Sequence, residues 1–325
     1  MMDWQEGPAA PPEGAAVALQ QHPVFASALK RIGRRTQALS LNWEGRSVGF
    51  AQIVLRRVGP LGEVALLSRG PAFAPELECP LRRRAVTALV ERLAMRKIAV
   101  IATPDPVAGA DPLAAAGWLE AMTPAVLARL DLTPEPAVLR ARLHGKWRNR
   151  LVAAERAGLH VTDAPFKPET ARWLLTEEAA QRRARRYGGL PLSLPMAWAA
   201  AGGPRATRLF EARLEGRRVA AMLFLIHPPG ASYTIGWSGP AGRDAGAHPL
   251  ILWRAMLWLR ARGIRDIDLG TLDTERAAGL ARFKLGAGAV PETLGATRFI
   301  APGTRAVARW FAGGAGARKQ DRVWS

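Results

Sequence analysis

The sequence predicts a mixed α/β protein built from two similar domains in tandem. Strand-like and helical patterns alternate along most of its 325 residues. A Glu-Gly-Arg turn with a valine two residues further on occurs twice, ending at Val48 and at Val219. A Gly-Pro pair follows at comparable intervals, at Gly70 and at Gly239. Because these landmarks recur in the same order and far apart in the chain, they indicate a duplicated domain rather than a solenoid of short repeats.

The first predicted domain covers residues 21–134. It follows a stretch rich in Pro, Ala and Gly, residues 1–20, that we expect to be mobile. Val86, Leu89, Val90 and Leu93 recur at helical spacing and form one apolar face. The expected elements are a helix at 22–33, strands at 38–43, 47–57 and 63–67, a helix at 81–96, a strand at 98–102, a short helix at 112–119 and a closing strand at 125–132.

The second predicted domain covers residues 135–300 and repeats this pattern around the turn Glu215-Gly216-Arg217. Its first helix is expected to link the domains, and a basic tail, residues 301–325, follows the last strand. The expected elements are helices at 135–157, 168–187 and 194–201, strands at 159–162, 206–214, 218–226, 232–237 and 266–269, a helix that begins in the loop 242–249 and a last helix that ends at Gly286.

Five short motifs occur in one order along the chain. They are Arg69-Gly70-Pro71; Lys146-Trp147-Arg148-Asn149-Arg150 with Gly158-Leu159; Leu250-Ile251-Leu252-Trp253-Arg254-Ala255-Met256 with Arg262-Gly263; Asp268-Leu269-Gly270; and Phe283-Lys284-Leu285-Gly286. In this order they resemble the motifs of FemAB-type acyltransferases, a family of the GNAT superfamily with tandem GNAT domains. The resemblance implies central parallel strands that diverge over a binding site. It also implies transfer of an acyl or aminoacyl group to an amine.

The pair Phe283-Lys284 is the strongest catalytic candidate. The resemblance implies that this pair lines the active site, and that the lysine holds the acyl donor or stabilises the negative charge that develops on it. A protonated lysine beside an acyl carbon is a suitable electrophile for an oxyanion. The same residues also suit the last turn of a helix, where cations interact favourably with the helix dipole. The two interpretations are compatible.

The attacking amine must also lose a proton, and the carboxylates that could accept it are Asp105, Asp268 and Glu211. Asp268 ends a predicted central strand, where functional groups of α/β sheets gather. Asp105, which precedes a proline, is similar to an Asp-Pro that the family carries facing its substrate. Strand-end acids also cap turns, and Asp-Pro is a common turn former. For Asp273, in the loop after Asp268, capping of the next helix is the better interpretation.

Donor binding is assigned to a loop containing Arg243, Gly246 and His248. This loop partly matches the one with which GNAT enzymes bind the coenzyme A pyrophosphate through backbone N–H groups. His248 stands where that pattern has a small residue, which weakens a coenzyme A interpretation. Acceptor binding is assigned to basic and aromatic residues: Arg69, Arg183, Arg185, Arg186, Tyr187 and Trp237. Solvated helix faces also carry such charge runs, and this alternative applies equally to Lys146, Arg148 and Arg150.

Composition restricts the partners. There are 46 Lys and Arg residues against 27 Asp and Glu, a net charge of +19 that attracts polyanions such as tRNA, a nucleotide-linked substrate or an anionic membrane. The single cysteine, Cys79, excludes internal disulfides and cysteine-based zinc sites, and the five histidines lack metal-ligand spacing, so no metal site is expected. No apolar run reaches the length of a membrane span. We expect a cytoplasmic protein, with its tail able to rest on the inner face of the membrane.

Together these features predict an acyltransferase whose active site lies chiefly in the second domain. The acceptor is expected to be an amine, with a peptidoglycan precursor as one candidate. No bound cofactor is expected; the donor is an aminoacyl-tRNA or an acyl-CoA used as co-substrate. The basic charge favours tRNA, but the chain lacks the helical arm that some family members insert in the second domain. An acyl-CoA-dependent N-acetyltransferase with another acceptor is therefore the close alternative, and an inactive module that binds anionic ligands is a third.

Overall fold

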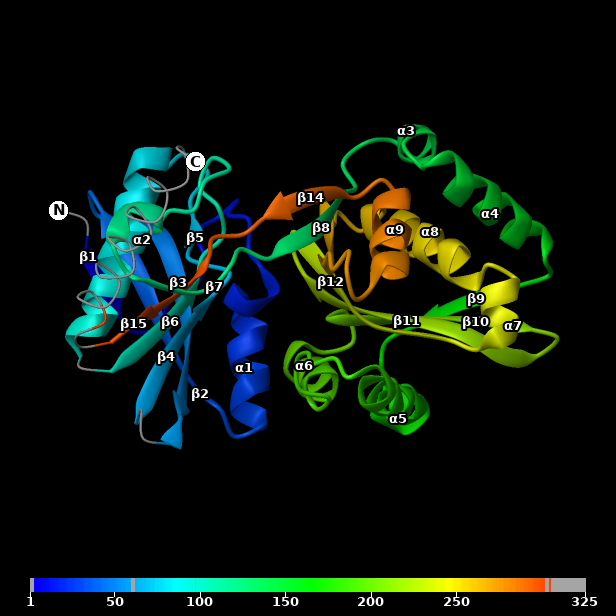
Figure 1. Ribbon diagram of the computed structural model, residues 1–325, viewed down its shortest axis with the longest axis horizontal. Helices are drawn as coiled ribbons and strands as arrows, with labels where there is room; N and C mark the ends of the chain where they lie inside the picture. Colours follow the sequence, from blue (N-terminus) through cyan, green and yellow to red (C-terminus); the bar gives the residue numbers. More distant parts are fainter. Residues whose placement is uncertain (1–2, 60–61, 97, 302–303, 305–325) are drawn as a thin grey trace, which may run out of the picture. The chain divides into compact units, whose positions relative to one another are not determined.

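The protein was analysed as a computed structural model that describes residues 3–59, 62–96, 98–301 and 304. The chain divides into two compact units (Figure 1). Unit 2 comprises Ser27–Ile32 and Val126–Glu292, and unit 1 comprises the rest of the described chain. Each unit is built on its own mixed sheet flanked by helices, so the predicted fold class, two tandem domains of mixed α/β structure, is confirmed. The predicted basic tail, 301–325, lies almost entirely outside the described residues.

Unit 1 contains an eight-stranded sheet in the order β1-β2-β3-β4-β6-β15-β7, with β5 paired to β3. Its long helix, α2, packs Val86, Leu89, Val90 and Leu93 into the core, as the helical spacing predicts. The strands are β1 (Asp3–Glu6), β2 (Arg35–Trp43), β3 (Arg46–Arg57), β4 (Glu63–Ser68), β5 (Ala72–Phe73), β6 (Ala99–Thr103), β7 (Leu119–Met122) and β15 (Thr297–Ile300); the helices are η1 (Leu19–Gln21), α2 (Cys79–Met95) and η3 (Ala114–Ala116). Helix α1 (Pro23–Arg31) belongs to unit 2 from Ser27 onward.

Unit 2 contains a seven-stranded sheet in the order β14-β8-β13-β12-β11-β10-β9. Alternate residues of β11 face opposite layers: Met222 and Phe224 join a core that includes α8, whereas Ala221 and Leu223 join one that includes α5 (Figure 1). The strands are β8 (Val126–Asp131), β9 (His160–Ala164), β10 (Thr207–Leu214), β11 (Arg217–His227), β12 (Gly230–Ser238), β13 (Asp266–Thr271) and β14 (Val290–Thr293); the helices are α3 (Pro136–Ala141), α4 (Gly145–Arg156), α5 (Pro168–Arg185), α6 (Leu194–Gly202), α7 (Pro240–Asp244), α8 (Ala247–Arg260) and α9 (Ala278–Gly286).

The repeated turn has the same backbone conformation in both units. Glu44 and Gly45 have φ angles of 50° and 74°, and Glu215 and Gly216 have φ angles of 51° and 75°. Two successive positive φ angles match the right-handed twist of a two-residue hairpin, which explains a glycine at the second position of each. The hairpins β2–β3 and β10–β11 that these turns join are antiparallel in both sheets. The repeat recognised in the sequence is therefore a repeat of structure.

Two strands belong to a different sheet from the one that their sequence position suggests. The strand expected at 125–132 to close the first domain is β8, which pairs with β13 in the sheet of unit 2. In return β15, near the end of the second predicted domain, lies between β6 and β7 in the sheet of unit 1. The predicted boundary between 134 and 135 therefore does not separate the two sheets. Apolar alternation identifies a strand but not its partner, because pairing is decided by tertiary contacts.

The N-terminal stretch, expected to be mobile, is instead part of unit 1. β1 pairs with β2, and the Trp4 side chain is only 2% exposed, with its indole N–H donating to the Ala85 carbonyl at 2.9 Å. Val17 and Leu19 are also buried. A Pro-, Ala- and Gly-rich composition suggested disorder, but a few apolar side chains in this stretch bury enough surface to hold it on the sheet.

The long helix expected at 135–157 is two helices, α3 and α4. The break falls at His144, which has an extended backbone and whose N–H donates to the Gly286 carbonyl at 3.0 Å. The short helix expected at 112–119 is reduced to one 3-10 turn, η3, and is followed by the unpredicted strand β7. Local helix propensity did not predict the break at His144 or the strand β7. The first involves a hydrogen bond to Gly286 and the second pairing with β15, and both partners are remote in sequence.

Candidate active site

The central parallel strands of unit 2 diverge where the candidate residues gather. β12 has nine residues, but only Gly230–Ser232 pair with β13, opposite Asp266–Asp268. Beyond these positions the two strands continue without pairing to each other, to Ser238 and to Thr271. Divergence of parallel strands opens a sheet at their carboxyl ends, which is where α/β proteins bind ligands. The expectation that central strands diverge is confirmed for unit 2.

Lys284 lies at this divergent end. It belongs to the last turn of α9, its residue is only 4% exposed, and its ammonium donates to the Thr271 carbonyl at 2.7 Å. Burial lowers its pKa to about 8, and the negative charge of Asp268 partly opposes this decrease. The amine is therefore close to the balance between its charged and neutral forms at neutral to mildly alkaline pH. A lysine buried in this way is poised for a chemical role as well as a structural one.

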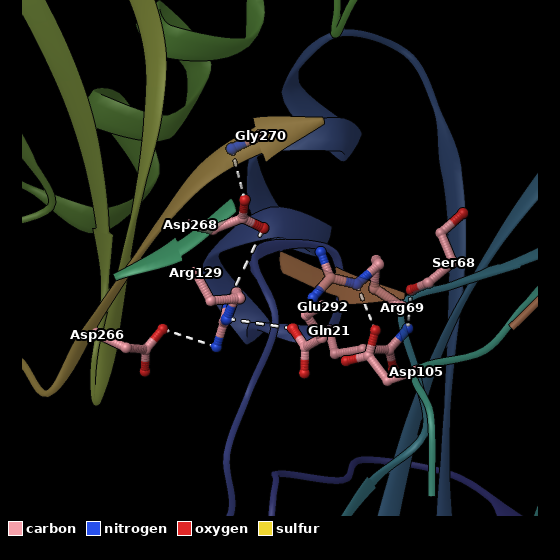
Figure 2. Close-up of polar contacts among 9 residues, drawn as sticks. All are labelled: Gln21, Ser68, Arg69, Asp105, Arg129, Asp266, Asp268, Gly270 and Glu292. Atoms are coloured by element: carbon pink, nitrogen blue, oxygen red, sulfur yellow. Dashed lines mark hydrogen bonds and ion pairs between the residues drawn. The ribbon is translucent and has the colours of Figure 1, made fainter. Parts of the chain in front are cut away.

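Asp268 is held from two sides. Its Oδ1 accepts the Gly270 N–H at 2.7 Å, and its Oδ2 lies 3.9 Å from the guanidinium of Arg129 on β8 (Figure 2). The same guanidinium contacts Asp266 at 2.7 Å and Glu292 at 3.3 Å. The turn-capping interpretation of Asp268 is thus confirmed, while its charge acts on Lys284. Sequence reasoning missed Arg129, because the strand that carries it was assigned to the other domain.

Aromatic side chains pack beside Lys284. The Phe283 ring lies 6.0 Å from that of Trp147 and 6.1 Å from that of His248, between centroids. Burial lowers the pKa of His248, so a neutral imidazole donates from Nε2 to the Trp237 carbonyl at 3.0 Å. The indole N–H of Trp147 is buried without a hydrogen-bond partner among the described residues. Leaving such a donor unpaired costs about 1–3 kcal/mol, a cost that ordinary packing residues avoid.

The predicted donor loop leads into α8. Gly246 is the N-cap with a φ of 68°, and a side chain there would contact Ala154 on α4 at 3.3 Å. Arg243 is exposed and donates to the Ser238 carbonyl at 2.5 Å, while its own carbonyl accepts from Arg150 at 2.7 Å. Arg243 and Arg150 therefore brace the loop against α4. His248 lies in the first turn of α8, directed to the Trp237 carbonyl.

The acceptor candidates at the end of α5 divide into two kinds. Arg183, Arg185 and Arg186 are exposed, as a solvated face would be. Tyr187 is also exposed, at 40%, but its hydroxyl donates to the buried carboxylate of Glu178 at 2.9 Å; partial desolvation and this carboxylate raise its pKa to about 12. Glu178, which the sequence analysis did not select, also accepts from Arg182 at 2.7 Å. Its position within a helical charge run, amid several glutamates and arginines, gave no signal of burial.

The remaining candidates of unit 2 have structural partners. Trp237 packs edge-on against Trp173 with ring centroids 5.4 Å apart, on the α5 side of the sheet. Glu211 is bound by Arg218 at 2.7 Å, and Asp273 accepts the N–H groups of Glu275 and Arg276. Lys284, Phe283, Asp268 and His248 are thus brought together, whereas Glu211 is used in an ion pair. The expectation that Asp273 caps the next helix is wrong, because α9 begins at Ala278 after the N-cap Ala277, which has no side-chain cap; Asp273 instead closes a turn in the preceding loop.

Two candidates lie in unit 1. Arg69 is 8% exposed, with a φ of 58°, and its Nε contacts the carboxylate of Asp105 (Figure 2). A buried glutamine, Gln21, donates to the carbonyls of Ser68 at 2.8 Å and Gln52 at 3.2 Å, and accepts the Gln52 N–H at 2.8 Å. Arg69 and Asp105 therefore bind each other within a polar cluster of their own unit. A carboxylate bound by a guanidinium is a weaker candidate for a general base, because its acceptor oxygen is already in use.

No group of His, Cys, Asp and Glu side chains among the described residues is arranged to hold a metal ion. No helix in the described part of the chain is long and apolar enough to cross a membrane.

Comparisons with known proteins identify the domain in which this site lies. Residues 141–288, which carry Lys284 and its neighbours, match the family described as "Acetyltransferase (GNAT) domain". A structure named "Crystal structure of FemX" has the same fold at a TM-score of 0.68 and 14% identity, with 85% of this chain and 91% of that chain covered. No curated protein sequence matches the chain.

Two further structures share the fold. The "Tandem GNAT protein from the clavulanic acid biosynthesis pathway (without AcCoA)" is 15% identical at a TM-score of 0.53, with 92% of this chain and 97% of that chain covered. The C-terminal domain of a putative lysylphosphatidylglycerol synthetase from Agrobacterium fabrum is 15% identical at a TM-score of 0.52, with 86% and 87% covered.

These findings define what the chain contains. Its second unit contains an acetyltransferase (GNAT) domain. The chain as a whole shares its fold with FemX and with the tandem GNAT protein.

Proposed function

We propose that this protein transfers an acyl or aminoacyl group from an activated donor to an amine, in a reaction centred on Lys284. The observation that carries the proposal is the buried ammonium of Lys284, held by the Thr271 carbonyl at the end where β12 and β13 diverge. Burial of a lysine without a function is unfavourable, because an ammonium loses its hydration. Its location at the open end of the sheet matches the place where an acyl carbonyl would bind in this class of fold.

The chemistry follows from the charge of the lysine. The acceptor nitrogen attacks the acyl carbon, a C–N bond forms, and the carbonyl oxygen becomes negatively charged. The protonated Lys284 has N–H donors besides the one on Thr271, and these would stabilise that oxygen. The bond from carbon to the donor oxygen or sulfur then breaks, and that atom takes up the proton that the amine loses, so the donor leaves as an alcohol or a thiol. A water chain carries this proton more readily than Asp268, because Arg129 and the Gly270 N–H already hold the Asp268 carboxylate.

For the donor we favour aminoacyl-tRNA. The net charge of +19 suits a polyanionic donor, and α4 presents Lys146, Arg148 and Arg150 on its exposed face next to the loop at Arg243. His248 stands in the first turn of α8, where a coenzyme A loop has a small residue. The resemblance to FemAB-type enzymes supports a peptidoglycan precursor as acceptor. The similarity to a lysylphosphatidylglycerol synthetase domain makes a lipid another candidate and is compatible with association at an anionic membrane.

An acyl-CoA donor is the alternative, with an acceptor outside the cell wall. The α8 N-terminus with Gly246 at its N-cap supports it, and so does the likeness to a tandem GNAT protein whose name mentions AcCoA. A catalytically inactive module that binds anionic ligands is the third candidate. It is disfavoured by the burial of Lys284, which a module binding only through surface charge does not need.

The deciding experiment measures binding in near-physiological salt to aminoacylated tRNA, the same tRNA uncharged, and acetyl-CoA. The uncharged tRNA controls for the bulk attraction of a basic protein to RNA. Preference for the aminoacylated form supports aminoacyl transfer, and transfer to muramyl-peptide or lipid acceptors is then tested. Binding of acetyl-CoA alone would replace this proposal with the N-acetyltransferase. Selective, saturable binding of uncharged polyanions without any turnover would leave only the inactive module.

A further inference from the structure

A cluster of one cation and three anions lies behind Lys284 in unit 2. Arg129 projects from β8 and contacts Asp266 and Asp268 on β13 and Glu292 on β14 (Figure 2). Arg129 and Asp268 are directly opposite each other in the antiparallel pairing of β8 with β13. The Arg129 side chain is 28% exposed and the Asp268 side chain 14%. Partial burial of this kind strengthens the interaction relative to a surface ion pair.

The cluster reaches the lysine through one residue. Asp268 binds the N–H of Gly270, and a Cβ added to Gly270 would lie 3.6 Å from the Lys284 Nζ. Asp268 and Lys284 therefore both lie close to Gly270. The φ of Gly270 is 80°, a conformation that favours glycine and keeps this approach open.

We propose that Arg129 is a positioning residue for the reaction, one that holds and partly neutralises the carboxylate of Asp268 and thereby controls the charge acting on Lys284. The proposal rests on the proposed function of Lys284. It adds Arg129, which acts on Lys284 through Asp268. A guanidinium fork can bind several carboxylates at once, which a single ammonium cannot do with the same geometry. Arg129 comes from β8, a strand that the N-terminal half of the sequence contributes to this sheet.

The other charged groups around Lys284 do not replace this pair. Arg282 on α9 and the loop residues Asp273, Glu275 and Arg276 are exposed. The basic residues of α4, Lys146, Arg148 and Arg150, are exposed as well. His248 on α8 contacts Phe283 and is kept neutral by burial. The negative charge of Asp268 is the one that raises the pKa of Lys284 against the effect of burial.

The inference is tested by measuring the pKa of Lys284 directly, using protein labelled with 13C-lysine. The sequence has six lysines, so the Cε resonances can be followed individually, and Lys284→Met identifies the resonance of interest. Asp268→Asn should lower the pKa of Lys284, because an anion that favours the ammonium is lost. Arg129→Met should raise it by about one unit, because Asp268 then acts unneutralised. The matched control is Arg142→Met, which removes an exposed arginine paired with Asp131 and should cause no change.

The double variant decides whether Arg129 acts through Asp268. If it does, Arg129→Met should have no effect on Lys284 in the Asp268→Asn background. An equal increase in both backgrounds, or no increase in a folded Arg129→Met protein, overturns the proposal. Circular dichroism verifies folding. Should Arg129→Met not fold, Arg129→Lys keeps the charge without the fork, and a smaller increase in the same direction is then expected; no increase in Arg129→Lys overturns the proposal.

A kinetic measurement connects the inference to catalysis. The alkaline limit of the pH–rate profile should move upward in Arg129→Met by the same amount as the pKa of Lys284, whereas a purely structural role would lower the rate at every pH equally. The resonance titration does not require turnover. A protein inactive with every donor would thus refute the proposed function and still report whether Arg129 controls Lys284.

Discussion

The two units share a fold but differ at the same point of their sheets. In unit 1 the parallel strands β4 and β6 pair over five positions, from Val64 with Ala99 to Ser68 with Thr103, and Arg69 extends the contact by donating to the Thr103 carbonyl. In unit 2 the corresponding strands β12 and β13 pair over three positions and then diverge. One duplicated sheet is therefore closed and the other open, and the candidate catalytic lysine lies in the open one.

The side chains at that point follow the same division. In unit 1 Gly70 follows Arg69 at the end of β4, and its Cα is covered by the buried Gln21 side chain. In unit 2 the equivalent Gly239-Pro240 begins α7, with only ordinary contacts around Gly239. Backbone hydrogen bonds join β4 to β6 up to the end of β4 in unit 1. In unit 2 the pairing of β12 with β13 stops at Ser232 and Asp268. The comparison teaches that duplication kept the scaffold, while the opening of one sheet provided space for chemistry.

Removing β15 is expected to have the largest effect. This strand lies between β6 and β7, so a chain truncated after residue 296 would leave β7 unpaired and β6 open on one edge, and would remove the buried Ile300 from the core. We expect the β-sheet of unit 1 to be lost, with a large decrease in soluble yield and a reduced circular dichroism signal. If the truncated chain kept its native stability, the stability of unit 1 would not depend on β15.

Replacement of Lys284 tests the open sheet directly. Lys284→Met should lower turnover by about 100-fold or more, the cost of removing one donor to a developing oxyanion. The free energy of unfolding should not decrease greatly, because methionine fills the same space without a buried charge. Lys167→Met, which removes an exposed lysine at the N-cap of α5, is the matched control and should retain activity. Undiminished turnover in Lys284→Met would remove the assigned role of the lysine.

The two Gly-Pro positions offer a matched pair of substitutions. A Cβ at Gly70 would lie 2.3 Å from the Gln21 Cδ, whereas a Cβ at Gly239 would meet Trp237 atoms no closer than 3.6 Å. Gly70→Ala should therefore destabilise the protein by about 1–3 kcal/mol, as overpacking does, and Gly239→Ala should change stability little. Urea unfolding measures both. Equal effects at the two positions would contradict the proposed difference between the closed and the open unit.

The pH dependence gives the smallest expected effect near neutrality. Lys284 should be protonated for the proposed role, so turnover should be nearly constant below its pKa of about 8 and decrease as the pH rises through it. Stability changes in the opposite direction. A folded-state pKa below that of the unfolded chain means that the unfolded state binds more protons, so the stability contribution of this group increases as the pH rises from about 8. Turnover that increases through this range would indicate that neutral Lys284 is the active form.

Local pattern predicted most of the elements and the class of the protein. The Glu-Gly turns, the apolar face of α2 and the order of motifs around Asp268 and Phe283-Lys284 depend on residues close in sequence, and the structure and comparisons agree with them. Their predictability has a physical basis, since positive φ angles and helical spacing are properties of a few consecutive residues. The roles assigned to the site residues remain predictions; these residues are Lys284, Phe283, Asp268, Asp105, Arg69, Arg183, Arg185, Arg186, Tyr187, Trp237, Arg243, Gly246 and His248.

Only the tertiary structure decided what each strand pairs with. It placed β8 in unit 2 and β15 in unit 1, folded the N-terminal stretch onto the sheet through Trp4, and brought Arg129 to Asp268 across more than a hundred residues of chain. Such contacts leave no trace in local sequence, because hydrogen bonding between strands involves backbone groups that all residues share. The sequence by itself thus determined most helices and strands and the choice of Lys284 as the catalytic candidate. The pairing of distant strands determined which charged side chains surround Lys284.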